Sequence, residues 1–148
     1  MPYTHLLRQG RIRPHNTNAG EIASLFAIIE RDLVDAALAG LSVDRRFATA
    51  YNAVLQAATV VMYAEGYRSH GSGHHATTFA FLRAVPGADW EKWADYFDAC
   101  RRKRNLADYV GVGYISSTEA DELLKEAHAF VKAVRAWLEE RYEHLLQG

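Results

Sequence analysis

The sequence is poor in cysteine and proline, and each shortage excludes certain kinds of fold. Its 148 residues contain one cysteine, Cys100, which excludes an intramolecular disulfide and leaves no cysteine pair for a zinc ribbon or an iron–sulfur cluster. A single cysteine is typical of a reducing compartment, so we expect a cytoplasmic protein. The three prolines lie outside the long helical patterns, as a helical fold requires, because proline breaks the interior of a helix.

Long apolar runs and an excess of charge are also missing. No segment approaches the roughly 20 apolar residues that a membrane-spanning helix needs, and residues 1–15 lack the apolar stretch of a secretory signal. The 17 basic and 18 acidic side chains give a formal net charge of −1, which does not by itself indicate nucleic acid or a membrane as partner. Because 49% of the residues are hydrophobic, one domain of this length can bury a core.

Apolar residues recur at helical spacing along most of the chain. Asn18 followed by Glu21, and Ser116 followed by Glu119, resemble capping boxes, which mark the start of a helix. The pattern predicts an all-α fold, an up-and-down helical bundle of four main helices plus one short helix. We expect these five helices at residues 18–40, 42–66, 77–82, 90–108 and 116–146.

Three segments show no sustained period and are expected to be irregular. Residues 1–19 mix Pro, Gly, Asn and basic residues, and we interpret them as an extended N-terminal arm ahead of the bundle at residues 20–148. Residues 66–75 read GYRSHGSGHH and predict a polar loop, while residues 109–117 predict a connection. The alternation of period two that marks strands is missing.

One arc of the predicted helix at 90–108 joins apolar to charged residues. At about 100° per residue, this arc carries Trp93, Phe97, Cys100, Arg104 and Asp108. Arg104 needs a partner there, because an unpaired buried charge is very costly. Two interpretations stay open: Arg104 forms an ion pair with Asp108 that closes the end of the bundle, or its planar guanidinium lines a cleft and binds phosphate.

Basic residues cluster just before Arg104. The run of Arg101, Arg102 and Lys103 is typical of a solvated helix face, although it would also attract the backbone of RNA. Cys100 is expected to be a small core residue rather than a nucleophile. A pocket for a small ligand or nucleotide between the helices is a further interpretation.

The segment RNLADY at 104–109 resembles the Arg-x-x-Ala-Asp-Tyr signature of one branch of the HEPN family, the UPF0332-like branch. The flanking segments RRFATAYNAVLQAA and EAHAFVKAV are also similar, so the resemblance covers roughly residues 20–148. It implies a helical bundle that commonly dimerises. In many members, an arginine and a histidine four to six residues later form a metal-independent RNase centre at the dimer interface. Such members often act as toxins or in defence, with nucleotidyltransferase-like antitoxins as partners.

The resemblance carries over residue by residue, and one position departs from it. Arg104 matches the arginine and Asn105 the polar residue that often follows it, but Tyr109, Val110 and Gly111 stand where the histidine is expected. Tyrosine, with an ordinary pKa near 10, is a poor substitute for histidine in acid–base catalysis. We therefore expect a homodimeric module that binds a partner protein or RNA without catalysis. The alternative is a metal-independent endoribonuclease that uses Arg104, Asp108 and Tyr109.

Three histidines gather in the loop at residues 66–75. His70 and His74 have the i, i+4 spacing of metal ligands on a helix, but Gly71 and Gly73 argue against a helix there. We expect no metal and no cofactor. His70, His74 and His75 are candidate binding residues, and one of them could serve as a base if the loop lies near Arg104.

Overall fold

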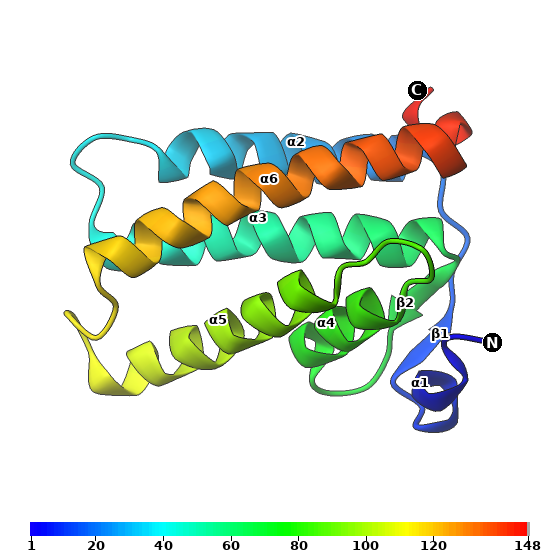
Figure 1. Ribbon diagram of the computed structural model, residues 1–148, viewed down its shortest axis with the longest axis horizontal. Helices are drawn as coiled ribbons and strands as arrows, with labels where there is room; N and C mark the ends of the chain where they lie inside the picture. Colours follow the sequence, from blue (N-terminus) through cyan, green and yellow to red (C-terminus); the bar gives the residue numbers. More distant parts are fainter. Residues whose placement is uncertain (148) are drawn as a thin grey trace.

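The computed structural model describes residues 1–147 and folds them into a helical bundle with one small sheet (Figure 1). The elements in chain order are α1 (Thr4–Arg8), β1 (Ile12–Pro14), α2 (Ala19–Ala36), α3 (Val43–Ala64), β2 (Tyr67–Ser69), α4 (His74–Ala84), α5 (Glu91–Val110), α6 (Ser117–Arg141) and the 3-10 helix η1 (Glu143–Leu146). The predicted all-α bundle is confirmed, with α2, α3, α5 and α6 as its main helices and α4 as its short one. None of the described helices combines the length and the apolar character that a bilayer crossing needs.

Helix α3 lies at the centre of the bundle. Helices α2 and α6 lie on one side of it, and α4 and α5 lie on the other (Figure 1). Because neighbours surround α3, apolar residues are buried along its whole length, and many of them are alanines that let other helices approach closely. This arrangement places residues of α3 between the two outer layers, where side chains of α4 and α5 reach them.

Side-chain caps fix the starts of α2 and α6, as the sequence predicts. The Asn18 side chain accepts the backbone N–H of Glu21 at 2.8 Å. Ser116 and Glu119 form a complete capping box, with hydrogen bonds of 3.1 and 2.9 Å. The first box is incomplete, because the Glu21 carboxylate binds the His15 ring at 2.7 Å instead of its own helix cap.

The N-terminal segment is not the extended arm that its composition suggests. It forms α1 and β1, and β1 pairs antiparallel with β2 so that Ile12 faces Ser69. Tyr3 stacks on Phe81 of α4 with 4.0 Å between ring centroids, and Leu6 is buried. The prediction of a loop over 66–75 is therefore wrong at both ends, since β2 occupies its start and α4 begins at His74.

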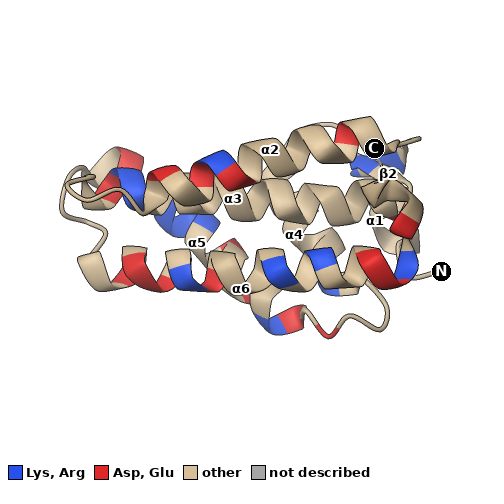
Figure 2. Ribbon diagram, turned by 90° about the horizontal axis from the view of Figure 1, so that it is seen from above, with Lys and Arg blue, Asp and Glu red and all other residues tan. Residues whose placement is uncertain are grey.

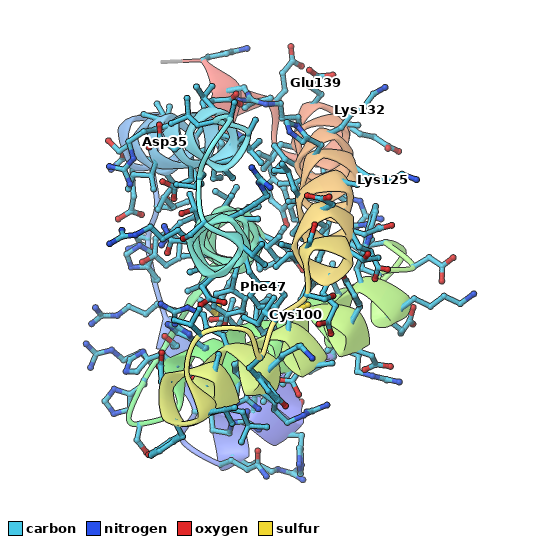
Figure 3. All side chains as sticks on the ribbon, turned by 90° about the vertical axis from the view of Figure 1, so that its left-hand side faces the viewer. Asp35, Phe47, Cys100, Lys125, Lys132 and Glu139 are labelled. Atoms are coloured by element: carbon cyan, nitrogen blue, oxygen red, sulfur yellow. The ribbon has the colours of Figure 1, made fainter. Side chains whose placement is uncertain are left out.

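An aromatic cluster joins α5 to α6. Phe130 of α6 is fully buried, and its ring centroid lies 5.1 Å from that of Phe97, 5.3 Å from Trp93 and 5.7 Å from Trp90. Cys100 is buried in the interior below α3 (Figure 3), and burial raises the pKa of its thiol to about 11. A thiol that stays protonated at neutral pH is a core residue rather than a nucleophile, which agrees with the prediction.

Candidate functional site

Arg104 lies near the C-terminal end of α5, and its side chain contacts α3. The guanidinium carbon lies 5.4 Å from the centroid of the Tyr51 ring, within the range of a cation–π interaction. The first of the two interpretations, an ion pair of Arg104 with Asp108, does not hold: the Asp108 side chain is exposed, and no carboxylate of residues 1–147 pairs with Arg104. The partner of Arg104 is thus the aromatic ring of Tyr51 and not the carboxylate of Asp108.

The other basic residues of the run at 101–104 form ion pairs with carboxylates. On the ribbon of α5, basic positions form a continuous stretch, and isolated acidic positions lie close to it (Figure 2). Their ion pairs are Arg101–Asp98 at 2.8 Å, Arg102–Asp98, and Lys103–Glu119 at 2.6 Å. Within the described chain, Arg104 is therefore the member of this run that forms no ion pair, while Arg101 and Arg102 share the single carboxylate of Asp98.

His75 completes a cluster with Arg104 and Tyr51. It lies in the first turn of α4, and its Nδ1 is hydrogen-bonded to the Tyr51 hydroxyl at 3.1 Å. The Tyr51 side chain is buried. Its ring contacts the Arg104 guanidinium, and its hydroxyl is hydrogen-bonded to His75. We call these three residues the Arg–Tyr–His cluster. It joins α3, α4 and α5, three helices that the bundle topology brings to one place.

Burial and the surrounding positive charge favour the neutral form of the His75 imidazole. Burial, followed by the positive charges of Arg104 and Arg101, lowers the pKa of His75 below its ordinary value. A neutral imidazole carries one N–H donor and one acceptor nitrogen. Since Tyr51 occupies Nδ1, the Nε2 atom is the one that can meet a ligand, as a donor or an acceptor depending on the tautomer. Burial also raises the pKa of Tyr51, so its hydroxyl stays protonated.

Two hollows flank the cluster along α5. One, of about 250 Å³, lies between α3 and the end of α5 and is lined by Arg104 together with Asp44 and Asp108. The other, of about 260 Å³, lies between α4 and α5 and includes Arg101. It also holds the guanidinium groups of Arg11 and Arg83, against the carboxylates of Asp95 and Asp98. The second hollow therefore favours an anionic ligand more than the first.

The remaining candidates on α5 lie away from this cluster. Asn105, Asp108 and Tyr109 are exposed, Tyr109 to 90%, and the hydrogen bond and ring contacts of Tyr51 within residues 1–147 involve none of the three. The helix continues through Tyr109 to Val110, which directs these side chains outward. Asp108 and Tyr109 are thus placed on the surface beside Arg104 rather than joined to it.

The histidine cluster is split by the start of α4. His70 is exposed, with its backbone N–H bonded to the Arg11 carbonyl at 2.7 Å, and His74 Nδ1 is bonded to the Ser69 hydroxyl at 2.6 Å. No group of three or more His, Cys, Asp or Glu side chains in residues 1–147 has the arrangement of a metal site. Of the three histidines, the fold brings His75 to Arg104.

Tyr51 is the site residue that sequence reasoning missed. Tyr51 recurs at helical spacing with the apolar residues of α3, which is typical of a core residue, and its ring is buried. The hydroxyl partner comes from α4 and the cation from α5, so nothing within its own helix marks it as part of a site.

Comparison with known families places the chain. The model of the HEPN_SAV_6107-like HEPN family matches residues 37–135, a range that spans α3, α4, α5 and most of α6 and contains the whole Arg–Tyr–His cluster. Comparisons with curated proteins and with solved structures returned no match. Because the family model covers about two-thirds of the chain, the protein belongs to the HEPN_SAV_6107-like HEPN family.

Proposed function

We propose that this HEPN protein is a homodimeric module that binds RNA and that Arg104 is its principal phosphate-binding residue. The observation that carries the proposal is the position of the Arg104 guanidinium, which lies on the Tyr51 ring without a carboxylate partner among the described residues. A guanidinium held by one face keeps its N–H edge available, and that edge matches two phosphate oxygens at once.

Two neighbours of Arg104, His75 and Arg101, support an anionic ligand. His75 offers a polar nitrogen without adding a negative charge, and it lies one hydrogen bond away from the ring that holds Arg104. Arg101 lies about one helical turn before Arg104 and binds Asp98 through Nε, which leaves its terminal N–H groups for a second phosphate. A chain of phosphates, rather than a single one, suits this spacing.

The end of α5 supports dimer formation. Large apolar side chains are exposed there, although such groups are usually covered in a monomer. They are Leu106, Tyr109, Val110 and Val112, with exposed fractions of 49%, 90%, 62% and 97%. We infer that a second copy covers this patch, which would bring the two Arg104 side chains to one interface.

A negative charge introduced into this patch is expected to dissociate the dimer. Val112→Asp should give the mass of one chain in multi-angle light scattering, whereas the wild type should give twice that mass, because burying an unpaired carboxylate is costly. Val34→Asp is the matched control, since Val34 is 67% exposed on α2, away from the patch. A wild type that stays monomeric at the highest soluble concentration, or a dimeric Val112→Asp variant, would refute this interface.

RNA binding is tested by removing the Arg104 side chain. Arg104→Ala should weaken the affinity for single-stranded RNA about tenfold or more and reduce the salt dependence by about one phosphate contact. Fluorescence anisotropy of a labelled RNA, measured over a salt series in EDTA, reports both quantities. Arg45→Ala removes an exposed arginine of α3 and should change the affinity less than about twofold. Equal losses in the two variants, or no binding by folded wild type, would contradict the proposal.

A second candidate function is metal-independent RNA cleavage, and the neutral His75 favours it. In this step, His75 Nε2 accepts the proton of a ribose 2′-hydroxyl as that oxygen bonds to the adjacent phosphorus. The bond from phosphorus to the 5′ oxygen breaks, and the 5′ oxygen takes a proton from water. Arg104 stabilises the negative charge that develops on the phosphate oxygens. A nucleotidyltransferase-like partner and a role in a toxin–antitoxin or defence system stay predictions from the family resemblance.

A further inference from the structure

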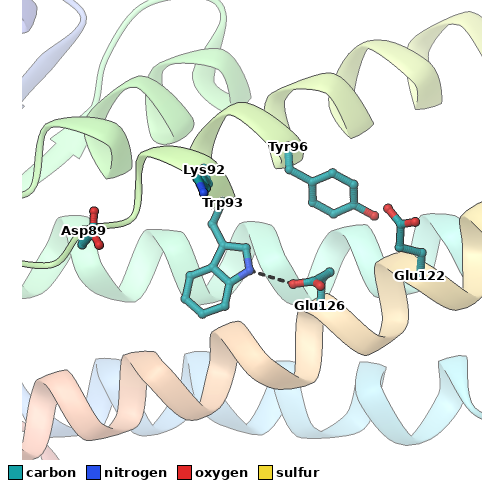
Figure 4. Close-up of a pocket in the computed structure, with 6 residues that line it drawn as sticks. All are labelled: Asp89, Lys92, Trp93, Tyr96, Glu122 and Glu126. Carbon is teal, nitrogen blue, oxygen red and sulfur yellow. Dashed lines mark hydrogen bonds between the residues drawn. The ribbon is translucent and has the colours of Figure 1, made fainter.

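A groove separate from the Arg–Tyr–His cluster lies between the N-terminal halves of α5 and α6 (Figure 4). Its volume is about 450 Å³, which is within the range of small-ligand sites. The residues that line it are Asp89, Lys92, Trp93, Tyr96, Glu122 and Glu126. Two aromatic rings and three carboxylates therefore face one space with a single lysine.

Neutral donors hold the carboxylates of this groove. The Trp93 indole N–H donates to Glu126 Oε2 at 2.9 Å, and the Tyr96 hydroxyl points toward the Glu122 carboxylate (Figure 4). None of the ion pairs within residues 1–147 involves Asp89, Glu122 or Glu126. The tryptophan and tyrosine thus orient two carboxylates without cancelling their charge, and the lining keeps an excess of negative charge.

We propose that this groove binds a small organic cation, a diamine or polyamine. The carboxylates attract ammonium groups, and the faces of Trp93 and Tyr96 attract them further while covering the methylene chain. Glu122 and Glu126 are four residues apart on α6, which places them about 6 Å apart along the helix. Two ammonium groups joined by a chain of four methylenes have a similar separation.

The same lining disfavours other classes of small ligand. An anion would meet three carboxylates with only Lys92 to offset them. An uncharged apolar ligand would strip water from Glu122 and Glu126 without supplying a cation, which is unfavourable. The charge of the groove therefore selects a cationic occupant, and its aromatic walls select one with an alkyl chain.

Isothermal titration calorimetry of the full-length protein with spermidine tests this proposal. The wild type should show saturable binding at one site per chain in phosphate buffer at low salt. Glu122→Gln with Glu126→Gln should weaken that binding about tenfold or more, because two of the three carboxylates that line the groove lose their charge. The control is Glu139→Gln with Glu140→Gln, which removes two exposed charges from α6; Glu139 points into solvent (Figure 3). The control should change the affinity less than about twofold.

Tryptophan fluorescence supplies a second readout that reports the place of binding. Trp90 and Trp137 are each 6% exposed, whereas Trp93 is only half-buried and lines the groove. Spermidine should change the emission of the wild type but not that of Trp93→Phe, which keeps an aromatic wall. No saturable heat with wild type, equal losses in the groove and control variants, or an emission change that persists in Trp93→Phe would each overturn the proposal.

Discussion

Replacing Phe130 with alanine is expected to lower the free energy of unfolding by about 3–5 kcal/mol. Phe130 is fully buried, and its ring meets Trp90, Trp93 and Phe97 in edge-on contacts. These contacts form the aromatic link between α5 and α6. Alanine would remove the transfer free energy of the ring and leave a cavity whose large aromatic walls cannot close around it.

Urea denaturation followed by circular dichroism measures this loss. Val34→Ala is the control, because Val34 lies exposed on α2 and should change stability by less than about 0.5 kcal/mol. Domains of this size are stable by about 5–15 kcal/mol, so Phe130→Ala should still fold at low temperature, with a lower midpoint. A loss below about 1 kcal/mol would show that α5 does not depend on this contact.

The main helices could be predicted because their signals are local. The Asn18 cap binds Glu21 three residues away, and the Ser116 box closes on Glu119 at the same distance. Apolar spacing within each helix likewise depends on neighbours in the chain. Sequence reasoning therefore gave the right helices and the right class of fold, with ends that differ by a few residues.

The missed elements depend on contacts between distant segments. Strands β1 and β2 have three residues each, too few for a period of two to be visible, and each exists because the other pairs with it. Helix α1 is equally short, and Tyr3 fixes it against Phe81 far along the chain. No pattern within residues 1–19 carries that information.

The start of α4 shows how one residue changes a prediction. Gly73 has a φ of 72°, a left-handed conformation that glycine adopts at little cost, and α4 begins directly after it. The glycine that argued against a helix is therefore its N-terminal boundary. As a result, His75 leaves the expected loop and occupies the first turn of a helix packed against α3.

The candidate site could be predicted only in part, because it also depends on contacts between distant segments. Helical periodicity singled out Arg104, because the arc of a helix is local information. Of the two interpretations of Arg104, the ion pair with Asp108 is not formed, since Asp108 is close in sequence but Tyr51 is close in space. The choice between a carboxylate and an aromatic ring matters for the charge: a carboxylate would neutralise Arg104, whereas the Tyr51 ring leaves its positive charge uncompensated.

Under the second candidate function, metal-independent RNA cleavage, replacing His75 with alanine is expected to reduce the cleavage rate in EDTA by about 10²–10⁴-fold. The His75 side chain is more than one-third exposed, so its loss should leave the fold intact. His74→Ala is the matched control, because His74 is the adjacent exposed histidine and binds Ser69 rather than Tyr51. The control should cleave at nearly the wild-type rate.

The pH dependence of cleavage gives an independent signature of His75. A general base acts in its neutral form, and the rate should therefore fall as the pH drops through the pKa of His75. Burial and the charges of Arg104 and Arg101 lower that pKa below its ordinary value of about 6.5, so the wild-type profile should lie at lower pH than that of an ordinary histidine. A rate that still rises above pH 8 would assign the base to another group.

Arg104 is expected to affect both phosphate binding and the pKa of His75. Arg104→Ala removes one of the positive charges that lower the pKa of His75, so the residual activity should rise at a higher pH than in the wild type. Arg104→Lys keeps the charge and should keep the position of the profile, while its rate falls because lysine lacks the planar fork. If folded wild type cleaves no RNA in EDTA, the ribonuclease candidate is wrong. RNA binding by the same sample, lost in Arg104→Ala, would then assign the His75 nitrogen to phosphate binding as an N–H donor.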